Sequence, residues 1–252
     1  MSSEEIKGEV RKAYSRVAGR KAEEQSDRQA SGCCGPETTS SCGPSSSLLD
    51  SMGYDTEGLP SSATESFAGC GNPVALASLR AGETVLDLGS GAGLDVFMAA
   101  RQVGETGRVI GIDMTPAMLE KARMNVEKIG LTNVEFREGD IENLPVDDDS
   151  IDVIISNCVI NLAPDKAKVF RESFRVLRPG GRLMVSDIVL EVGLPTGFRD
   201  EIATYTGCIG GAISEDEYLQ HIRDAGFENV EVVSKAGFGY ASSAKIAAYK
   251  PN

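Results

Sequence analysis

The chain has 252 residues, of which 41% are hydrophobic, and this is enough apolar material for one large domain with a sizeable core. Its formal net charge of −13 argues against nucleic-acid binding, because proteins bind phosphates nonspecifically through lysine and arginine. No apolar run approaches the roughly 20 residues of a membrane-spanning helix, and the charged N-terminus is unlike a secretory signal. We therefore expect a cytoplasmic protein that binds neither membranes nor nucleic acids.

The N-terminal part predicts a helix followed by a loop. Apolar residues recur at intervals of three or four, which is typical of an amphipathic helix: Ile6, Val10, Tyr14 and Val17. This helix is either a packing element or a lid. Residues 31–47 are almost entirely Ser, Gly, Pro, Thr and Cys, the composition of a flexible loop. The loop contains three of the cysteines, which are Cys33, Cys34 and Cys42.

Strand-like and helix-like segments alternate from residue 82 onward. The expected strands are 84–88, 108–113, 134–137, 151–155 and 183–188. The expected helices are 93–103, 116–130 and 165–177, of which the second opens with Pro116 and ends at Gly130. Alternation of this kind predicts a parallel sheet with helices on both faces.

The alternation of strand-like and helix-like segments stops after the fifth expected strand. Residues 191–211 are rich in Gly, Thr and Pro and contain Cys208. A helix over 214–225 follows, and two closing strands are expected at 230–233 and 245–249.

The segment Val85 to Gly93 reads VLDLGSGAG and joins the first expected strand to the first expected helix of this unit. Its glycines allow a tight turn and let a ligand approach the backbone, although a turn without a ligand is the simpler alternative. Asp113 ends the second expected strand, where an acid can accept hydrogen bonds from ribose hydroxyls. The third glycine comes one residue too early for a dinucleotide fingerprint. Asp87 would repel a pyrophosphate but attract an ammonium group, and S-adenosylmethionine combines an ammonium group with an adenosine.

Four segments resemble the class I S-adenosylmethionine-dependent methyltransferases: 86–93, 111–114, 139–141 and 177–181. In that family the first segment holds the methionine end of the cofactor, and the next two hold the ribose and the adenine. The resemblance therefore implies these cofactor-binding residues: Asp87, Gly89, Ser90, Gly91, Gly93, Asp113, Met114, Asp140 and Ile141. We add Asn157, which follows the fourth expected strand and either lines the same pocket or caps a turn.

Cys158 follows the fourth expected strand, at the sheet edge where open α/β sheets bind ligands. Cys70 and Cys208 stand beside glycines in two distant loops. A single buried cysteine often acts as a small hydrophobic residue, but three that meet would suit a soft, thiol-seeking substrate. The only histidine, His221, lies in an expected helix, so conventional acid–base catalysis is not indicated.

Three further segments resemble the arsenite methyltransferases: 67–73, 156–162 and 205–211. This resemblance implies that Cys70, Cys158 and Cys208 bind trivalent arsenic as the catalytic thiols. It also implies a fourth cysteine that takes part in disulfide exchange, and Cys42 or the Cys33–Cys34 pair could match it; our candidates are Cys42 and Cys34. The implied substrates are thiol complexes of arsenite and methylarsenite, with a thioredoxin- or glutathione-type reductant as a partner. A methyltransferase for a small organic molecule and a metalloid-sequestering protein are the alternatives.

The strand pattern and the resemblance together predict an α/β fold that is Rossmann-like and doubly wound. We expect a mostly parallel seven-stranded sheet with an antiparallel closing strand, an N-terminal helix and loop, and a small cap inserted after strand five. The expected division is an N-terminal helix and Cys-rich loop (1–70), a cofactor-binding core (71–190), a substrate-binding insertion (191–227) and closing strands (228–252). A monomer is the working hypothesis for the quaternary state.

Overall fold

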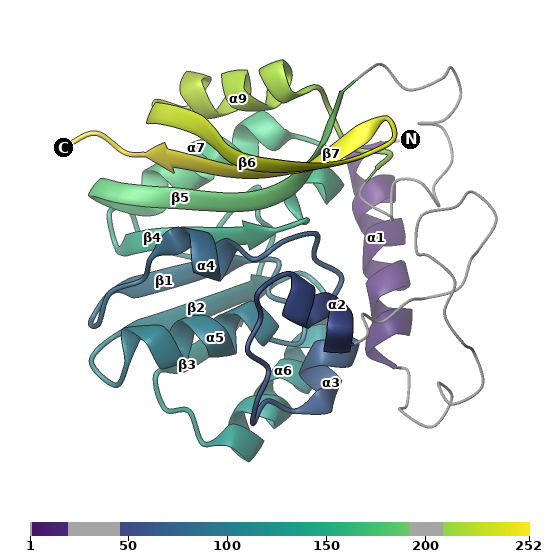
Figure 1. Cartoon of the computed structure of the whole chain (residues 1–252), viewed down its shortest axis with the longest axis vertical. Helices are drawn as coiled ribbons and strands as arrows, with labels where there is room; N and C mark the ends of the chain where they lie inside the picture. Colours follow the sequence, from purple (N-terminus) through teal and green to yellow (C-terminus); the bar gives the residue numbers. More distant parts are fainter. Residues whose placement is uncertain (1, 20–45, 192–208) are drawn as a thin grey trace.

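The computed structural model describes residues 2–19, 46–191 and 209–252. Its centre is a seven-stranded sheet with the strand order β3-β2-β1-β4-β5-β7-β6 (Figure 1). The strands are β1 (Thr84–Leu88), β2 (Arg108–Asp113), β3 (Val134–Glu138), β4 (Ile151–Asn157), β5 (Leu177–Leu190), β6 (Glu228–Phe238) and β7 (Ala241–Tyr249). Within this sheet β7 alone runs opposite to the other strands, because it is antiparallel to both β5 and β6 while the remaining ladders are parallel. The predicted fold class is therefore confirmed.

Helices cover both faces of the sheet. They are α1 (Ser3–Ala18), α2 (Ser46–Ser51), α3 (Ser61–Glu65), α4 (Pro73–Ala77), α5 (Leu94–Val103), α6 (Pro116–Ile129), the 3-10 turn η2 (Ile160–Leu162), α7 (Lys166–Val176) and α9 (Glu215–Asp224). Side chains of α4 and α5 pack in one apolar cluster, and those of α7 and α9 pack in the other. Strand β1 supplies Val85 to the first cluster and Leu86 and Leu88 to the second. Burial on both faces explains why this strand is apolar at successive positions.

Several expected boundaries agree with the structure, and the exceptions have local causes. Helix α6 begins at Pro116, and Gly130 caps its end with a φ of 69°, as the sequence predicts. Strand β5 instead begins six residues early, because Leu177 already pairs with Ile151 before a register shift in the ladder. Strands β6 and β7 are longer than expected, since they pair with each other as an antiparallel hairpin. The exposed residues of β6 are mostly polar, although Val233 is among them, so the strand does not form a continuous apolar run.

Helix α1 lies across the carboxyl ends of the strands, where open α/β sheets bind ligands (Figure 1). Its Val10 is buried in a small cluster together with Cys158 and Leu162. Near its first turn, Lys7 Nζ lies 2.6 Å from Asp140 Oδ2 and 2.7 Å from Glu142 Oε2. The helix thus covers the ligand-binding edge of the sheet and is fixed there by both apolar and ionic contacts.

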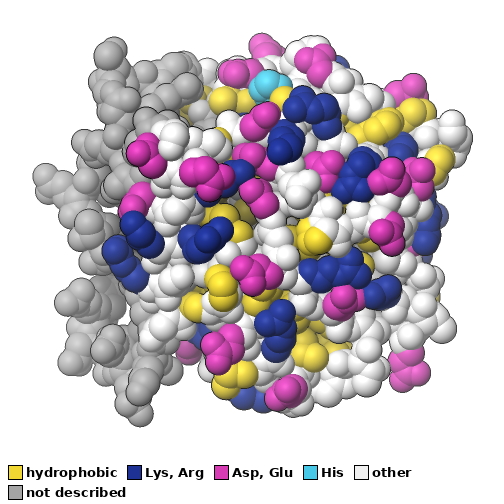
Figure 2. Space-filling view, turned by 180° about the vertical axis from the view of Figure 1, so that it is seen from behind, with side chains coloured by type: hydrophobic (Ala, Val, Ile, Leu, Met, Phe, Trp, Pro, Cys, Tyr) yellow, Lys and Arg dark blue, Asp and Glu magenta, His cyan; other side chains and the backbone are white. Residues whose placement is uncertain are grey.

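The face seen from behind carries charges of both signs. Figure 2 shows lysine and arginine side chains alternating with aspartate and glutamate, with single apolar side chains between them. Charges of that face therefore compensate one another at short range. Among the helices of the described residues, none combines the length and the apolar character needed to cross a bilayer.

Candidate cofactor and thiol site

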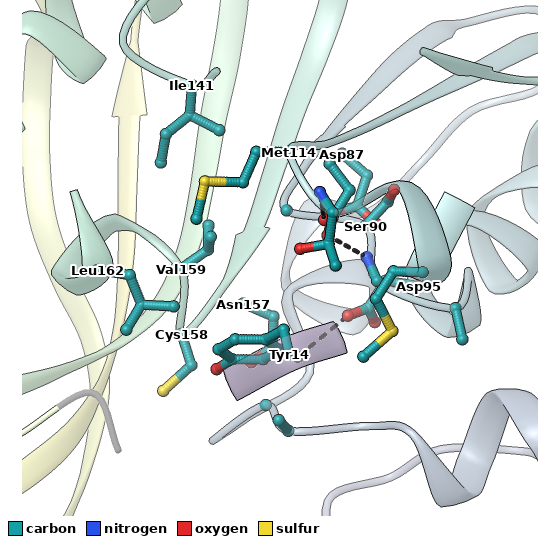
Figure 3. A pocket seen from close by; sticks show the side chains of 18 of the residues that line it. Tyr14, Asp87, Ser90, Asp95, Met114, Ile141, Asn157, Cys158, Val159 and Leu162 are labelled. Carbon is teal, nitrogen blue, oxygen red and sulfur yellow. Dashed lines mark hydrogen bonds between the residues drawn. The ribbon is translucent and has the colours of Figure 1, made fainter. Parts of the chain in front are cut away.

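A pocket opens under α1 at the carboxyl ends of β1, β2 and β4 (Figure 3). Nine of the ten predicted cofactor residues line it: Asp87, Gly89, Ser90, Gly91, Asp113, Met114, Asp140, Ile141 and Asn157. In Figure 3 Asp87, Ser90 and Asp95 lie on one side, whereas Cys158 and Leu162 lie on the other. The pocket therefore joins a polar wall of acids and loop atoms to an apolar wall that carries a thiol.

Gly93 does not line the pocket. It precedes α5 with a φ of 98°, and a Cβ there would lie 2.5 Å from Phe97 Cζ. The glycine at this position allows the chain to turn into α5 against an aromatic ring.

The glycine loop is shaped by backbone contacts that only glycine permits. Gly89 has a φ of 68°, and a Cβ on it would lie 2.3 Å from Val159 Cγ2. The Gly91 N–H donates to Asp113 Oδ2 at 2.9 Å, and the Thr115 N–H donates to Asp113 Oδ1 at 2.8 Å. Ser90 Oγ is buried with no hydrogen-bond partner within the described part of the chain. Because an unpaired buried hydroxyl is costly, this atom is suited to a polar ligand.

Three carboxyl groups crowd the polar wall: Asp87, Asp95 and Asp113. Burial raises the pKa of Asp87 well above its ordinary value, and the nearby charges of Asp95 and Asp113 raise it further. Burial also raises the pKa of Asp95 to about 6, against hydrogen bonds from Tyr54 and Asn157 that lower it. Burial likewise raises the pKa of Asp113. A cationic group placed among these acids would relieve their repulsion, so the wall favours a ligand with an ammonium group.

Asn157 is the centre of a hydrogen-bond network at the floor of the pocket. Its Nδ2 carries two hydrogens and has three acceptors within reach: Tyr54 Oη at 2.9 Å, Asp95 Oδ2 at 3.1 Å and Gly71 O at 2.8 Å. Its Oδ1 accepts the N–H of Cys70 at 3.0 Å. Tyr54 Oη in turn donates to Asp95 Oδ1 at 2.6 Å. The network ties the loop of Cys70 to the end of β4 and to the first turn of α5.

Cys158 lies at the sharp turn that follows β4. Its φ of 59° is in the left-handed region, which costs a residue with a Cβ about 1–2 kcal/mol, and its N–H donates to Ser186 O at 2.8 Å. The side chain is 4% exposed. The turn therefore directs the thiol to the apolar wall of the pocket, beside Tyr14 and Leu162 in Figure 3.

Cys70 packs against the same apolar cluster that contains Cys158. It is partly exposed and lies next to the pocket-lining Gly69, although it is not itself one of the lining residues. Ile209, which follows Cys208 in the sequence, packs against this cluster as well. Cys208 itself, and Cys33, Cys34 and Cys42, lie outside the described residues.

Several residues of the site were not predicted from the sequence. Lys7 and Tyr14 reach the pocket from α1, and Asp95 reaches it from α5. Asp95 resembles an ordinary acid in the first turn of a helix, where negative charge is common. Its proximity to the glycine loop is the one signal that could have identified it. Tyr54 lies in a segment without periodicity, so nothing in its surroundings indicated a role.

A family model described as a methyltransferase domain matches residues 79–226. The arsenite methyltransferase of Halobacterium salinarum is 49% identical over 206 residues, which cover 81% of this chain and 51% of that protein. The chain spans about half the length of the curated relatives that it matches first.

Solved structures of methyltransferases are similar to this chain as well. An arsenic(III) S-adenosylmethionine methyltransferase from Chlamydomonas reinhardtii aligns with a TM-score of 0.65 and 36% identity, over 77% of this chain and 71% of that one. An S-adenosylmethionine-dependent methyltransferase from Aquifex aeolicus aligns with a TM-score of 0.53 and 27% identity, over 69% of this chain and 86% of that one. The acids and the unpaired Ser90 hydroxyl fit this cofactor, which carries an ammonium group and hydroxyls. The chain therefore belongs to the S-adenosylmethionine-dependent methyltransferase family, on the branch that contains the arsenite methyltransferases.

Proposed function

We propose that the protein methylates trivalent arsenic, with arsenite and methylarsenite as substrates and S-adenosylmethionine as the methyl donor. One observation carries the proposal: the pocket lined by the glycine loop and the acids extends to Cys158, and Cys70 packs in the same apolar cluster as Cys158. Thiols are the preferred ligands of a soft ion such as arsenic(III). Cys208 is proposed as the third ligand, since Ile209 beside it packs against that cluster.

The cofactor would lie between the acids and α1. Asp87 and Asp95 would attract its ammonium group, the Ser90 hydroxyl would hydrogen-bond its polar end, and Asp113 would accept hydrogen bonds from the ribose. Met114 and Ile141 would contact the adenine, and Asp140 would accept a hydrogen bond from its amine. When bound, S-adenosylmethionine supplies an electrophilic methyl group on a sulfonium. Helix α1 closes this site from above through Val10 and Tyr14, which line the pocket, and so excludes water from the reaction.

The proposed reaction needs cysteine thiols for two tasks, which are binding arsenic and reducing it after methyl transfer. Arsenite exchanges its three hydroxyl groups for three cysteine sulfurs and releases three waters. The lone pair of arsenic would then form an As–C bond with the methyl group, and the two electrons of the broken methyl–sulfur bond would stay on the sulfur of the donor. Arsenic rises from the +3 to the +5 state, and it returns to +3 when one sulfur ligand leaves in a disulfide with another thiolate. Alignment of the lone pair with the methyl group supplies most of the catalysis.

Redox partners complete the proposal. Cys42 and Cys34 are the candidates for the thiolate that forms the disulfide, and a thioredoxin- or glutathione-type reductant would restore both thiols. No step requires a base to remove a proton from the nucleophile, which agrees with a chain that contains one histidine. We retain a monomeric, cytoplasmic enzyme and the division of the chain after residues 70, 190 and 227 as predictions.

The direct test is incubation of the protein with arsenite, S-adenosylmethionine and a thiol reductant, followed by mass spectrometry of the arsenicals. Methylated arsenic and S-adenosylhomocysteine are expected in matching amounts. Cofactor binding without methylated arsenic would contradict the proposal and favour an organic substrate. Arsenic that binds but stays unmethylated would instead indicate sequestration.

Lys7 is expected to slow release of the cofactor by fixing α1. The variant Lys7→Met removes an ammonium group that pairs with Asp140 and with the buried Glu142, so α1 should open more often. We expect S-adenosylmethionine to bind roughly fivefold more weakly. The loss should come from faster dissociation of the cofactor, which stopped-flow fluorescence measures. Lys12→Met is the matched control, because Lys12 is exposed on the same helix and forms an ion pair with Glu9 of that helix. An unchanged dissociation rate in Lys7→Met would show that α1 does not limit release.

Cofactor affinity is expected to fall as the pH drops below about 6, where Asp95 takes up a proton. A raised pKa means that the folded protein binds protons more readily than the unfolded chain, so acidification stabilises the fold of the free protein. Acidification also removes the negative charge that attracts the ammonium group of the cofactor. A lower pH should therefore raise the stability of the free protein but lower its affinity for the cofactor. Calorimetric titration between pH 5 and pH 8 should show the loss for S-adenosylmethionine but little change for adenosine, which lacks the ammonium group. Equal pH dependence of both ligands would refute the assignment of the acids.

A further inference from the structure

The backbone of Cys70 is held on both sides of its Cα atom. Its N–H donates to Asn157 Oδ1 at 3.0 Å, and its carbonyl accepts the hydroxyl of Ser243 at 2.7 Å. Ser243 lies on β7, 173 residues away in the sequence. The two bonds come from different strands, so Cys70 is fixed to the sheet at two separate points.

The backbone of the Cys70 loop lies close to strands β5 and β7. Ser243 pairs with Ile188 in the ladder between β7 and β5, and Ile188 belongs to the cluster of Cys158. Gly71 lies directly over β5, where a Cβ would come within 2.8 Å of Ser186 Oγ. The loop therefore lies on strands β5 and β7, and its Cys70 packs against the apolar cluster that contains Cys158.

The glycines on both sides of Cys70 would leave its position variable without these two hydrogen bonds. Gly69 and Gly71 adopt many backbone conformations in the absence of other restraints. A thiol on such a loop would lose conformational freedom each time it bound a substrate, and this loss weakens binding. The hydroxyl of Ser243 and the amide of Asn157 remove that freedom before the substrate arrives.

We propose that Ser243 is a positioning residue that holds the Cys70 thiol where it can share one arsenic atom with Cys158. This inference rests on the proposed function, since it assigns Cys70 to the substrate. Ser243 is not among the residues that line the cofactor pocket, whereas Asn157 is. Loss of the Ser243 hydroxyl should therefore weaken metalloid binding without changing cofactor binding. Loss of the Asn157 side chain would affect both.

The test is the variant Ser243→Ala. Arsenite should bind roughly two- to tenfold more weakly, as expected for one lost hydrogen bond, and the KM for arsenite should rise more than kcat falls. The affinity for S-adenosylmethionine should stay at its wild-type value, and the melting temperature should fall by only a few degrees, because the lost hydrogen bond also contributes to the stability of the folded protein. Ser243→Thr keeps the hydroxyl on a strand that favours β-branched residues and should restore arsenite affinity.

The neighbouring residue provides a matched control. Ser242 is buried on the same strand, but its hydroxyl donates to Glu191 Oε1 at 2.6 Å rather than to the Cys70 loop. Ser242→Ala should therefore leave arsenite affinity unchanged. Unchanged arsenite affinity in Ser243→Ala, or equal losses for arsenite and S-adenosylmethionine, would overturn the positioning role while leaving the proposed function in place. A wild-type protein that does not bind arsenite would overturn the proposed function, and this inference with it.

Discussion

Replacing Cys158 by serine is expected to abolish arsenite methylation and to leave S-adenosylmethionine binding intact. Serine has nearly the same shape, so it should fit the buried turn after β4, but its hydroxyl is a hard oxygen that binds arsenic(III) poorly. Loss of one of three ligands should reduce kcat/KM for arsenite by about 100-fold or more, since even indirect support of a metal site is worth 10–100-fold. Arsenic speciation by mass spectrometry measures the first effect, and calorimetry measures the second.

Cys70→Ser provides the comparison within the same site. Both thiols belong to one apolar cluster, so both variants should lose arsenite binding without losing the cofactor. Melting curves should show that each variant remains folded. Full methylation activity in Cys158→Ser would remove this residue from the substrate site.

Replacing Asp87 by asparagine should have the opposite effect: it should weaken cofactor binding and leave the thiols that bind arsenite in place. Asparagine keeps the size of the side chain but removes the charge that would pair with the ammonium group of the cofactor. Leaving one member of a buried ion pair without its partner costs about 3–5 kcal/mol, so S-adenosylmethionine should bind roughly 100- to 5,000-fold more weakly. The free protein should melt at the same or a higher temperature, because burial and neighbouring acids already disfavour the charged form of Asp87.

Asp147→Asn is the control for this change of charge. Asp147 is exposed in the loop before β4, so its replacement should change neither cofactor affinity nor stability. An Asp87→Asn protein that binds S-adenosylmethionine with wild-type affinity would show that the cofactor does not place its ammonium group at this wall.

The local parts of the cofactor site could be predicted from the sequence because they follow from one strand, one loop and one helix. Gly89 needs a positive φ and a close contact with Val159, and only glycine meets both conditions. Asp113 could be placed because it ends the neighbouring strand. The edge hairpin of β6 and β7 was harder to bound, since most described residues of β6 are exposed and its polar residues hide the strand pattern.

The contacts that fix the thiol loop could not be predicted, because they join residues that are far apart in the chain. Asn157 bonds to Tyr54, 103 residues earlier, and Ser243 bonds to Cys70 across 173 residues. No periodicity or spacing marks such pairs, and each serine or asparagine has many ordinary roles at a turn or strand. The expected meeting of Cys70 and Cys158 came from resemblance, and the structure places both in one cluster. The place of Cys208 stays a prediction.

The most direct test is the position of arsenic in the arsenite-loaded protein, located by anomalous scattering at the arsenic absorption edge. We predict one arsenic atom beside the cofactor pocket, bonded to the sulfurs of Cys158, Cys70 and Cys208. Arsenic bound only by cysteines of the 31–47 segment, with Cys70 and Cys158 left unbonded, would contradict the account.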